Sequence, residues 1–584
     1  MGHLKQSLGW ARVIGIDFEY KPVPGSPPTP ICMVAVDFIS GRSWEIFFDG
    51  PKDYECPIEW GKKDLVVAHN FSAEASCFGV LGWSLPINIC CTMAEFRCHT
   101  NGTGAKYGLV DVCKRMGVPF TDGQYKNAMQ QLAITGGPYT TKEKQALIAY
   151  CRMDVDVLEH VLHKMPPVTG HSLIRGRYVA EDGLMGVRGL PVDAVGLKKL
   201  QETQNGLQED LATMLNKRLG AALFHGRSLS VKEMGRYLVE ISPDWPRTAT
   251  GVPKTADQTL KDNEHLHPHI PLLRQGLKTI RSLRKQGALV GSDGRHRFET
   301  IPFATSTGRT QPKGGGILTG PAFMRSYIQC PPKRVVVIAD FKSQEVIIAA
   351  ACSGDCAMVE DYYTDDFYLA FAKRAHAVGP DAQRGESPEV EKIRATYKQV
   401  ALAVQYGMGA TALSKKLGIS EIGAKGLLRT HRGAYPGYWK WVEKVGNVAA
   451  QNKPVTAALG WTLHPPYHSK TSSQSGKNPA LSIRNFPVQA TGSEILRATV
   501  IRLSEQGFEL LATVHDSVIV ELPIDGWETR KIQLGDIMTD ATRPLLNGHG
   551  VLVDSKVLHP GERYHDERGT EMWAFITEKL GLRG

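Results

Sequence analysis

The sequence has no long apolar run, no C-x-x-C pair and no internal repeat. Its most apolar stretch, residues 335–352, is interrupted by Asp340, Lys342 and Glu345, whereas a membrane helix needs about 20 apolar residues. The 11 cysteines are irregularly spaced, which excludes a disulfide scaffold, argues against a zinc site and indicates a reducing compartment. Residues 1–15 are too polar for a signal peptide. We therefore expect a cytoplasmic protein with no membrane partner.

The composition is that of an ordinary globular protein with an excess of positive charge. Of the 584 residues, 42% are hydrophobic and 22% are charged. This length corresponds to about three to five domains. The 69 Lys and Arg exceed the 59 Asp and Glu, and the net charge of +10 suits a polyanionic partner without proving one.

The periodicity of the apolar residues predicts an α/β chain with a helical middle section. Three strand patterns and one long helix pattern occupy residues 12–20, 31–38, 65–68 and 142–164. Pro166 and Pro167 mark a domain boundary, after which residues 166–300 are mostly helical. Further strands and helices are expected over residues 335–339, 391–406, 487–503, 510–514 and 518–522.

A basic stretch, residues 274–297, holds seven Lys and Arg residues and one acid, Asp293. Four of its cations recur at helical spacing: Arg274, Lys278, Arg281 and Lys285. The pattern is typical of a solvated helix face, but it suits equally a helix that lies along a phosphate backbone. The run alone leaves the two interpretations open.

Acidic residues follow the predicted strands of the first 165 residues. Asp17 and Glu19 lie two apart on a strand and so share one face. Glu74 follows the third strand, and Tyr150 and Asp154 lie four apart on one helix face. On their own, Asp17 and Glu19 would indicate only a strand edge that faces solvent. Together, the carboxylates suit two divalent ions about 3.5–4 Å apart, with Tyr150 orienting an attacking water.

This order resembles the proofreading 3′–5′ exonuclease domain of DNA polymerase I and its relatives. The signature of that family is Asp-x-Glu, then Asn with Asp four residues later, then Tyr-x-x-x-Asp. The matching positions here are Asp17 and Glu19, Asn70 and Glu74, and Tyr150 and Asp154. The resemblance implies an RNase H-like exonuclease domain over residues 1–165, with metal ligands Asp17, Glu19, Glu74 and Asp154. Glu74 stands where the family has Asp, so the nuclease rate stays open. We expect no 5′ nuclease domain.

The C-terminal half carries a second set of charged residues. Asp340 ends a buried strand, and Asp516 lies at the tip of a predicted hairpin. Between them, Arg394 and Lys398 are one turn apart on a predicted helix. Two cations opposite two carboxylates suit a nucleoside triphosphate, because cations bind the phosphates and carboxylates hold Mg²⁺.

Here the chain resembles the family A DNA polymerases. Asp340 with Glu345 resembles motif A, residues 394–407 resemble motif B, and His515 with Asp516 resembles motif C. Two further stretches, residues 305–309 and 485–491, match the Thr-x-Thr-Gly-Arg and Asn-x-Pro-x-Gln elements of that family. With the exonuclease motifs, the resemblance spans nearly the whole chain in the family's order.

The resemblance implies a role for each matched position. Asp340 and Asp516 would hold two Mg²⁺ ions, for which Mn²⁺ could substitute, and Lys398 would also protonate the leaving group. The residues implied in dNTP binding are Arg394, Lys398, Leu402, Tyr406, Glu345 and Tyr368. Those implied in DNA binding are Arg309, Gln489, His515 and Asn485, and the basic residues Arg274, Lys278, Arg281 and Lys285.

Several positions depart from the family pattern. Leu402 replaces an aromatic residue, Ser517 replaces the Glu after the motif C Asp, and Tyr368 replaces a His. Lys342 and Ser343 alter the middle of motif A. These changes indicate a divergent, phage-type branch.

We therefore expect an α/β multi-domain protein in which a right-hand polymerase domain follows the exonuclease. The expected layout is thumb 166–300, palm 301–354 and 481–584, and fingers 355–480. The expected activity is primer extension with proofreading, as the replicative enzyme of a phage in the host cytoplasm. Its expected partners are primer–template DNA, dNTPs and a replisome helicase, primase or processivity factor. The alternatives are a 3′–5′ exonuclease with a weak nucleic-acid-binding C-terminal half, a single-subunit RNA polymerase and a non-catalytic scaffold.

Overall fold

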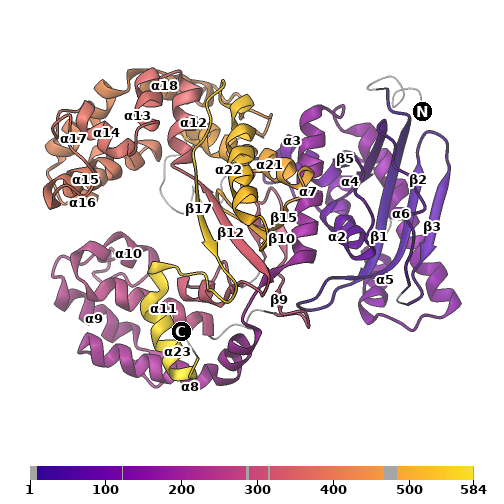
Figure 1. The fold of residues 1–584 in the computed structure, drawn as a ribbon, viewed down its shortest axis with the longest axis horizontal. Helices are drawn as coiled ribbons and strands as arrows, with labels where there is room; N and C mark the ends of the chain where they lie inside the picture. Colours follow the sequence, from indigo (N-terminus) through magenta and orange to yellow (C-terminus); the bar gives the residue numbers. More distant parts are fainter. Residues whose placement is uncertain are drawn as a thin grey trace.

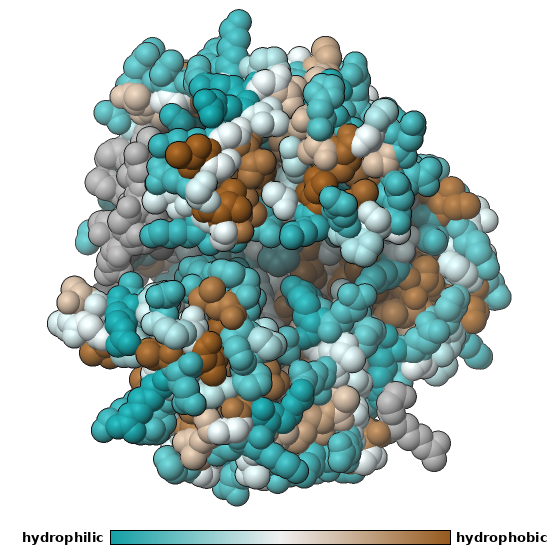
Figure 2. Space-filling view, turned by 90° about the vertical axis from the view of Figure 1, so that its left-hand side faces the viewer, coloured by the Kyte–Doolittle hydropathy of each residue, from teal (hydrophilic) through white to brown (hydrophobic). Residues whose placement is uncertain are grey.

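The computed structural model describes residues 9–50, 52–120, 123–283, 289–313, 316–465 and 483–582. An α/β unit at the N-terminal end adjoins a central antiparallel sheet, and two helical lobes project from the far side of that sheet (Figure 1). Seen from the side of the lobes, the surface is hollowed between them (Figure 2). Within the described ranges, no helix is both long and apolar enough to cross a membrane.

The N-terminal unit is built on a mixed five-stranded sheet in the order β3-β2-β1-β4-β5. Its strands are β1 (Arg12–Lys21), β2 (Thr29–Asp37), β3 (Ser43–Phe47), β4 (Asp64–Ala68) and β5 (Asn88–Cys91). Its helices are α2 (Ser72–Leu81), α3 (Thr92–Thr100), α4 (Leu109–Met116), α5 (Gly123–Thr135) and α6 (Thr141–Lys164). A capping box at Thr140 and Glu143 starts α6, which ends just before Pro166 as expected. The predicted α/β pattern of this unit is confirmed.

The central sheet is antiparallel, in the order β15-β16-β12-β17. Its strands are β12 (Arg334–Phe341), β15 (Glu509–Val514), β16 (Ser517–Pro523) and β17 (Val553–Leu558). Alternate residues of β12 face two different cores. Val335 and Val337 pack with helices that include α12 (Gln344–Ser353), α21 (Phe486–Glu505) and α22 (Trp527–Thr542), while Val336 and Ile338 pack toward the lower lobe of Figure 1. Burial on both faces fixes this strand, and with it Asp340 at its end.

The two lobes are helical. The lower lobe of Figure 1 contains α8 (Ala194–Leu219), α9 (Val231–Ile241), α10 (Asp257–Asp262), α11 (His269–Leu283) and α23 (Thr570–Leu580). The upper lobe contains α13 (Cys356–Tyr362), α14 (Phe367–Arg374), α15 (Pro388–Gln405), α16 (Ala410–Leu417), α17 (Glu421–Ala434) and α18 (Pro436–Ala450). Short strands form four two-stranded pairs outside the main sheets of the described chain: β6 (Leu190–Pro191) with β9 (Arg295–His296), β7 (Phe224–His225) with β8 (Ser228–Leu229), β10 (Thr300–Ile301) with β11 (Gln311–Pro312), and β13 (Val455–Thr456) with β14 (Thr462–Leu463).

Two helices pack away from the segments with which the sequence groups them. The helix α7 (Gly170–Arg188), expected to belong with residues 166–300, packs against α2, β5 and α21. The C-terminal α23, expected to belong with residues 481–584, packs on α8 and α11 through Met572 and Ile576. Sequence order misses both placements because they arise from tertiary packing. The remaining domain limits stay predictions.

Glycines let α7 lie directly against the backbone of the N-terminal unit. A Cβ at Gly176 would stand 2.0 Å from the carbonyl oxygen of Ile89, and one at Gly183 would stand 2.3 Å from that of Ser72. Any larger residue would therefore push the helix away from β5 and α2. The same helix contacts α21, so it joins the N-terminal unit to the central part of the molecule.

We expect Gly176→Ala to destabilise the protein by about 1–3 kcal/mol, because the methyl group cannot fit against Ile89. Thermal unfolding followed by circular dichroism measures this effect. The matched control is Gly186→Ala on the same helix, where a Cβ meets no atom within 4 Å. The control should gain up to about 1 kcal/mol from helix propensity. Equal stability of the two variants would contradict the close approach.

Candidate functional site

Two carboxylates meet at one end of the central sheet. Asp340 lies near the end of β12, opposite Ser517, and Asp516 lies in the two-residue turn between β15 and β16. Burial raises the pKa of Asp340 to about 7, together with the negative charge and the hydrogen bond of Asp516. Two such groups held together favour a cation between them. The structure therefore brings together the two residues predicted as metal ligands.

Both chain segments beside this pair have strained backbone. His515, which precedes Asp516, is exposed and has a φ of 59°. Ser343, which begins α12 just after β12, has a φ of 48°. Left-handed conformations of residues other than glycine cost on the order of 1–3 kcal/mol and often occur where side chains must be aimed.

A third carboxylate, Asp554, escapes the sequence analysis. It pairs with Asp340 between β17 and β12, so the two side chains share one face of the sheet. Its negative charge contributes to the raised pKa of Asp340. On the other side, Ser517 donates its hydroxyl to the carbonyl oxygen of Val514 at 2.8 Å. Only the strand pairing identifies Asp554, because no motif spacing links it to Asp340.

The predicted triphosphate-binding cations lie around one aromatic ring. The Arg394 guanidinium carbon is 5.9 Å and the Lys398 ammonium nitrogen 5.4 Å from the centre of the Tyr368 ring. Arg394 also donates two hydrogen bonds to Asp366, at 2.6 and 2.8 Å. The Tyr368 hydroxyl hydrogen-bonds to Ser343, which ties this group to the segment after Asp340. Asp366 therefore orients Arg394 and offsets its positive charge. The Lys398 side chain, in contrast, is exposed to solvent.

Four predicted residues from four separate segments form a polar cluster. Arg309 lies 3.5 Å from the Glu345 carboxylate. The Tyr406 hydroxyl donates to Glu345 and accepts from Gln489, and burial followed by the charge of Glu345 raises the Tyr406 pKa. Tyr406 remains 55% exposed, so the cluster faces solvent. Leu402, one turn earlier on α15, is half-buried.

Asn485 differs from this group because it is buried. It begins α21 with 6% of its surface exposed, and its Nδ2 has no hydrogen-bond partner among the described residues. Its burial does not favour the DNA contact predicted from the sequence.

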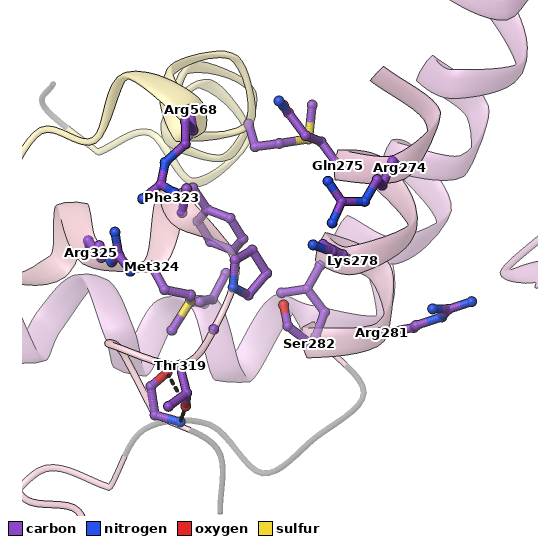
Figure 3. Close-up of a pocket in the computed structure, with 18 of the residues that line it drawn as sticks. Arg274, Gln275, Lys278, Arg281, Ser282, Thr319, Phe323, Met324, Arg325 and Arg568 are labelled. Atoms are coloured by element: carbon purple, nitrogen blue, oxygen red, sulfur yellow. Dashed lines mark hydrogen bonds between the residues drawn. The ribbon is translucent and has the colours of Figure 1, made fainter. Parts of the chain in front are cut away.

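The basic helix α11 lines a cavity of about 740 Å³, opposite residues 319–325 and Arg568 (Figure 3). Arg274, Lys278 and Arg281 all lie along it. Arg274, however, is bound by Asp257 at 2.9 Å and by Glu264 at 2.7 Å, so much of its charge is neutralised within the lobe. Lys278 is also ion-paired with Asp257, but at the longer distance of 3.8 Å. Lys278 and Arg281 therefore fit a phosphate contact better than Arg274 does, and Lys285 lies outside the described residues.

The N-terminal unit holds a second group of carboxylates. Asp17 and Glu19 come from β1, Glu74 from α2 and Asp154 from α6. Burial, followed by the charge of Asp154, raises the pKa of Asp17 to about 8. Burial and the charge of Asp17 raise the pKa of Glu19 to about 10 and that of Glu74 well above its usual range. The predicted exonuclease carboxylates are therefore mutually repelling neighbours.

Tyr150 and a lysine missed by the sequence analysis complete this group. Tyr150 donates a hydrogen bond to Asp154, and its ring packs edge to face on Tyr125 at 6.1 Å. The Lys126 ammonium lies 3.7 Å from Asp154 and partly counters the rise in the pKa of Asp17 and Glu19. Lys126 lies on α5, outside the three motifs, and no sequence pattern marked it.

Both carboxylate groups suit divalent cations that bind together with a substrate. Among the described residues, no three His, Cys, Asp or Glu side chains are already arranged around one ion. In the N-terminal group, three buried oxygens have no hydrogen-bond partner in the described part of the chain: Asp17 Oδ2, Glu74 Oε2 and Asp154 Oδ1. Mg²⁺ is commonly held by one or two carboxylates with substrate phosphates and water. The donors present fit that manner of binding.

Comparison with known proteins identifies the family. Residues 197–551 match the family described as "DNA polymerase family A". The chain belongs to this family. It is 29% identical over 266 residues to a DNA polymerase of Mycobacterium phage D29, covering 44% of this chain and 41% of that protein. It is 23% identical over 391 residues to DNA polymerase I of Deinococcus radiodurans, covering 63% of this chain and 40% of that protein.

A solved structure shares the fold. The POL domain of Pol1 from M. smegmatis, in complex with DNA primer-template and dNTP, superposes with a TM-score of 0.68 and 16% identity. The superposition covers 96% of this chain and 97% of that domain. The predicted family and its α/β polymerase fold are thereby confirmed. The matches span about two fifths of the length of the two relatives above. The family match begins after the N-terminal unit, so the exonuclease domain stays a prediction.

We expect Asp17→Asn to stabilise the metal-free protein at pH 8. The pKa of Asp17 is raised to about 8 in the folded state, so folding favours its protonated form. The free energy of unfolding therefore keeps this contribution near pH 4 and loses it as the pH rises toward 8. Asparagine removes this loss, and each kcal/mol regained raises Tm by about 2–4 °C. Thermal melts with EDTA should show the gain at pH 8 and little change at pH 5.

Asp53→Asn, at an exposed acid of the same unit, provides the control and should change Tm equally little at both pH values. Mg²⁺ should raise the Tm of the natural protein at pH 8 more than that of Asp17→Asn. A gain of the same size at pH 5 and pH 8 would argue against a buried, ionising Asp17.

Proposed function

We propose that this chain is a template-directed DNA polymerase that extends a primer 3′ end and proofreads it with a 3′–5′ exonuclease. The proposal rests mainly on one observation. Asp340 and Asp516 lie together, and Ser343, just after the strand of Asp340, interacts with Tyr368, whose ring lies beside Arg394 and Lys398. Membership of family A supports the same activity. The primer-template and dNTP bound by the M. smegmatis domain are the ligands we infer for this chain.

The parts of a right hand correspond to the parts of the structure. The central sheet, with α12, α21 and α22, is the palm. The lobe of α8 to α11, joined by α23, is the thumb, and the lobe of α13 to α18 is the fingers. The α/β unit before α7 is the exonuclease domain. The DNA would lie in the hollow between the two lobes (Figure 2), with Lys278 and Arg281 beside its backbone.

In the polymerase site, Asp340 and Asp516 would hold two Mg²⁺ ions, or Mn²⁺ in their place. Such ions would supply polarisation of the primer hydroxyl and neutralisation of the triphosphate. Arg394, held by Asp366, and Lys398 bind the triphosphate. The primer hydroxyl gives its proton to solvent water as its oxygen bonds to the α-phosphorus. The bond to pyrophosphate breaks, and Lys398 gives a proton to that leaving group.

The polar cluster selects the sugar and checks the primer end. Glu345 and Tyr406, joined by a hydrogen bond, close the space under the 2′ position of the nucleotide. Arg309, Gln489 and His515 touch the minor groove of the last base pairs, where the acceptors are nearly independent of sequence. These contacts therefore test the geometry of pairing.

In the exonuclease site, Asp17, Glu19, Glu74 and Asp154 would hold divalent cations, which would supply activation of water for attack on the terminal phosphate. Tyr150, held by Asp154, orients that water. The likeness to a mycobacteriophage polymerase supports a replicative role in a phage, acting in the host cytoplasm with a helicase, primase or processivity factor.

We expect Asp516→Ala to reduce primer extension by about 10³-fold or more and to spare shortening of the primer without dNTPs, because it removes a ligand from one site alone. Asp17→Ala should do the reverse. A labelled primer–template incubated with Mg²⁺, with and without dNTPs, measures both activities. Extension by Asp516→Ala would refute the polymerase site, and shortening by Asp17→Ala would refute the exonuclease site.

We expect Glu345→Ala to increase the use of ribonucleotides relative to deoxynucleotides by about 10- to 200-fold, since it opens space under the 2′ position. Single-nucleotide insertion with each substrate gives the ratio of kcat/KM values. Glu389→Ala, at an exposed acid on the first turn of α15, should leave the ratio unchanged. An unchanged ratio in Glu345→Ala would remove Glu345 from sugar selection.

A further inference from the structure

The N-terminal unit touches the loop that carries Arg309. Asn101 follows the last residue of α3, and its side-chain amide donates to the carbonyl oxygens of Ser306 at 2.7 Å and of Thr462 at 3.0 Å. Ser306 lies in the loop of residues 305–309, and Thr462 lies in the β13–β14 hairpin. One side chain of the exonuclease unit therefore bridges two segments of the polymerase part.

The same loop is held from two other directions. The Trp461 indole also donates to the Ser306 carbonyl oxygen, at 2.8 Å. Arg497, on α21 and 3% exposed, donates to the Gly308 carbonyl oxygen at 2.9 Å. Gly308 has a φ of 75°, and a Cβ there would lie 3.0 Å from Trp461. The loop is thus confined between α3, the hairpin and α21, with Arg309 at its end.

Further hydrogen bonds hold α3 against these segments. The backbone N–H of His464 donates to the Asn101 carbonyl oxygen at 2.9 Å, and the Cys98 thiol donates to that of Gly460 at 3.4 Å. The Arg97 guanidinium donates to the Pro302 carbonyl oxygen at 3.0 Å. Asn101 is the member of this set that donates to the 305–309 loop itself.

We propose that Asn101 is a positioning residue of the polymerase site. By joining the 305–309 loop to the hairpin, it sets the direction from which Arg309 reaches Glu345 and the primer 3′ end. The inference rests on the proposed polymerase function. It gives the exonuclease unit a second task, the support of synthesis, that does not depend on its own carboxylates.

The test measures single-nucleotide insertion by Asn101→Ala in an Asp17→Ala parent, so that shortening of the primer does not interfere. Loss of the two hydrogen bonds, which are at most partly buried, should lower the insertion rate about three- to tenfold. Asn101→Asp, which keeps the size but cannot donate, should lose at least as much. Because Asn101 acts through Arg309, adding Asn101→Ala to Arg309→Ala should cause little further loss.

Asn88→Ala is the matched control. The Asn88 amide also donates to two carbonyl oxygens, those of Lys62 at 3.0 Å and Asp64 at 2.9 Å, but both lie within the N-terminal unit. Insertion should be unchanged in this variant, and the Tm of each variant separates misfolding from mispositioning. The inference would be overturned if the Asn101 and Asn88 variants inserted nucleotides at the same rate. It would also be overturned if the fold-loss of the Asn101→Ala, Arg309→Ala double variant equalled the product of the two single losses. Absence of extension by the Asp17→Ala parent would overturn the proposed function as well.

Discussion

Repulsion between neighbouring carboxylates is the constraint around which both candidate sites are built. Asp340 and Asp516 lie within hydrogen-bonding distance, and Asp17 lies close enough to Asp154 for their charges to interact. The folded chain tolerates these pairs because rigid elements hold them and because protons remain bound near neutral pH. A cation that arrives with a phosphate relieves the repulsion, so the binding of substrate and the relief of strain are coupled.

The rigidity that this requires comes from close backbone packing. β12 is buried on both faces, which fixes Asp340 without any contribution from its own side chain. The glycines of α7 bring the N-terminal unit into direct contact with the same central part. Asn101 and Trp461 then fasten the loop of Arg309 through one shared carbonyl oxygen of Ser306. The two sites therefore sit on one continuous scaffold.

Local spacing in the sequence predicts the residues that share a strand, a turn or a helix face. Asp17 with Glu19, and Arg394 with Lys398, are predicted in this way, whereas Asp340 with Glu345 is implied by the resemblance to motif A. Residues that reach a site through tertiary packing are not predicted, and Asp554, Lys126 and Asn101 are of this kind. Arg274 shows the opposite difficulty. The resemblance to the polymerase family implies that it contacts DNA, but Asp257 and Glu264, which the fold of the lobe brings close, already bind it.

The pairing of β17 with β12 also bears on Ser517, which stands where the family pattern has Glu after the motif C aspartate. A serine after Asp516 removes one negative charge from the edge of β16, and its hydroxyl is turned to the carbonyl oxygen of Val514. Asp554 stands on the opposite side of Asp340, at the paired position of β17. Asp554 therefore supplies a third carboxylate beside Asp340, in addition to Asp516. Because Asp554 is exposed, it adds charge to the site with little of the desolvation cost that a buried acid would carry.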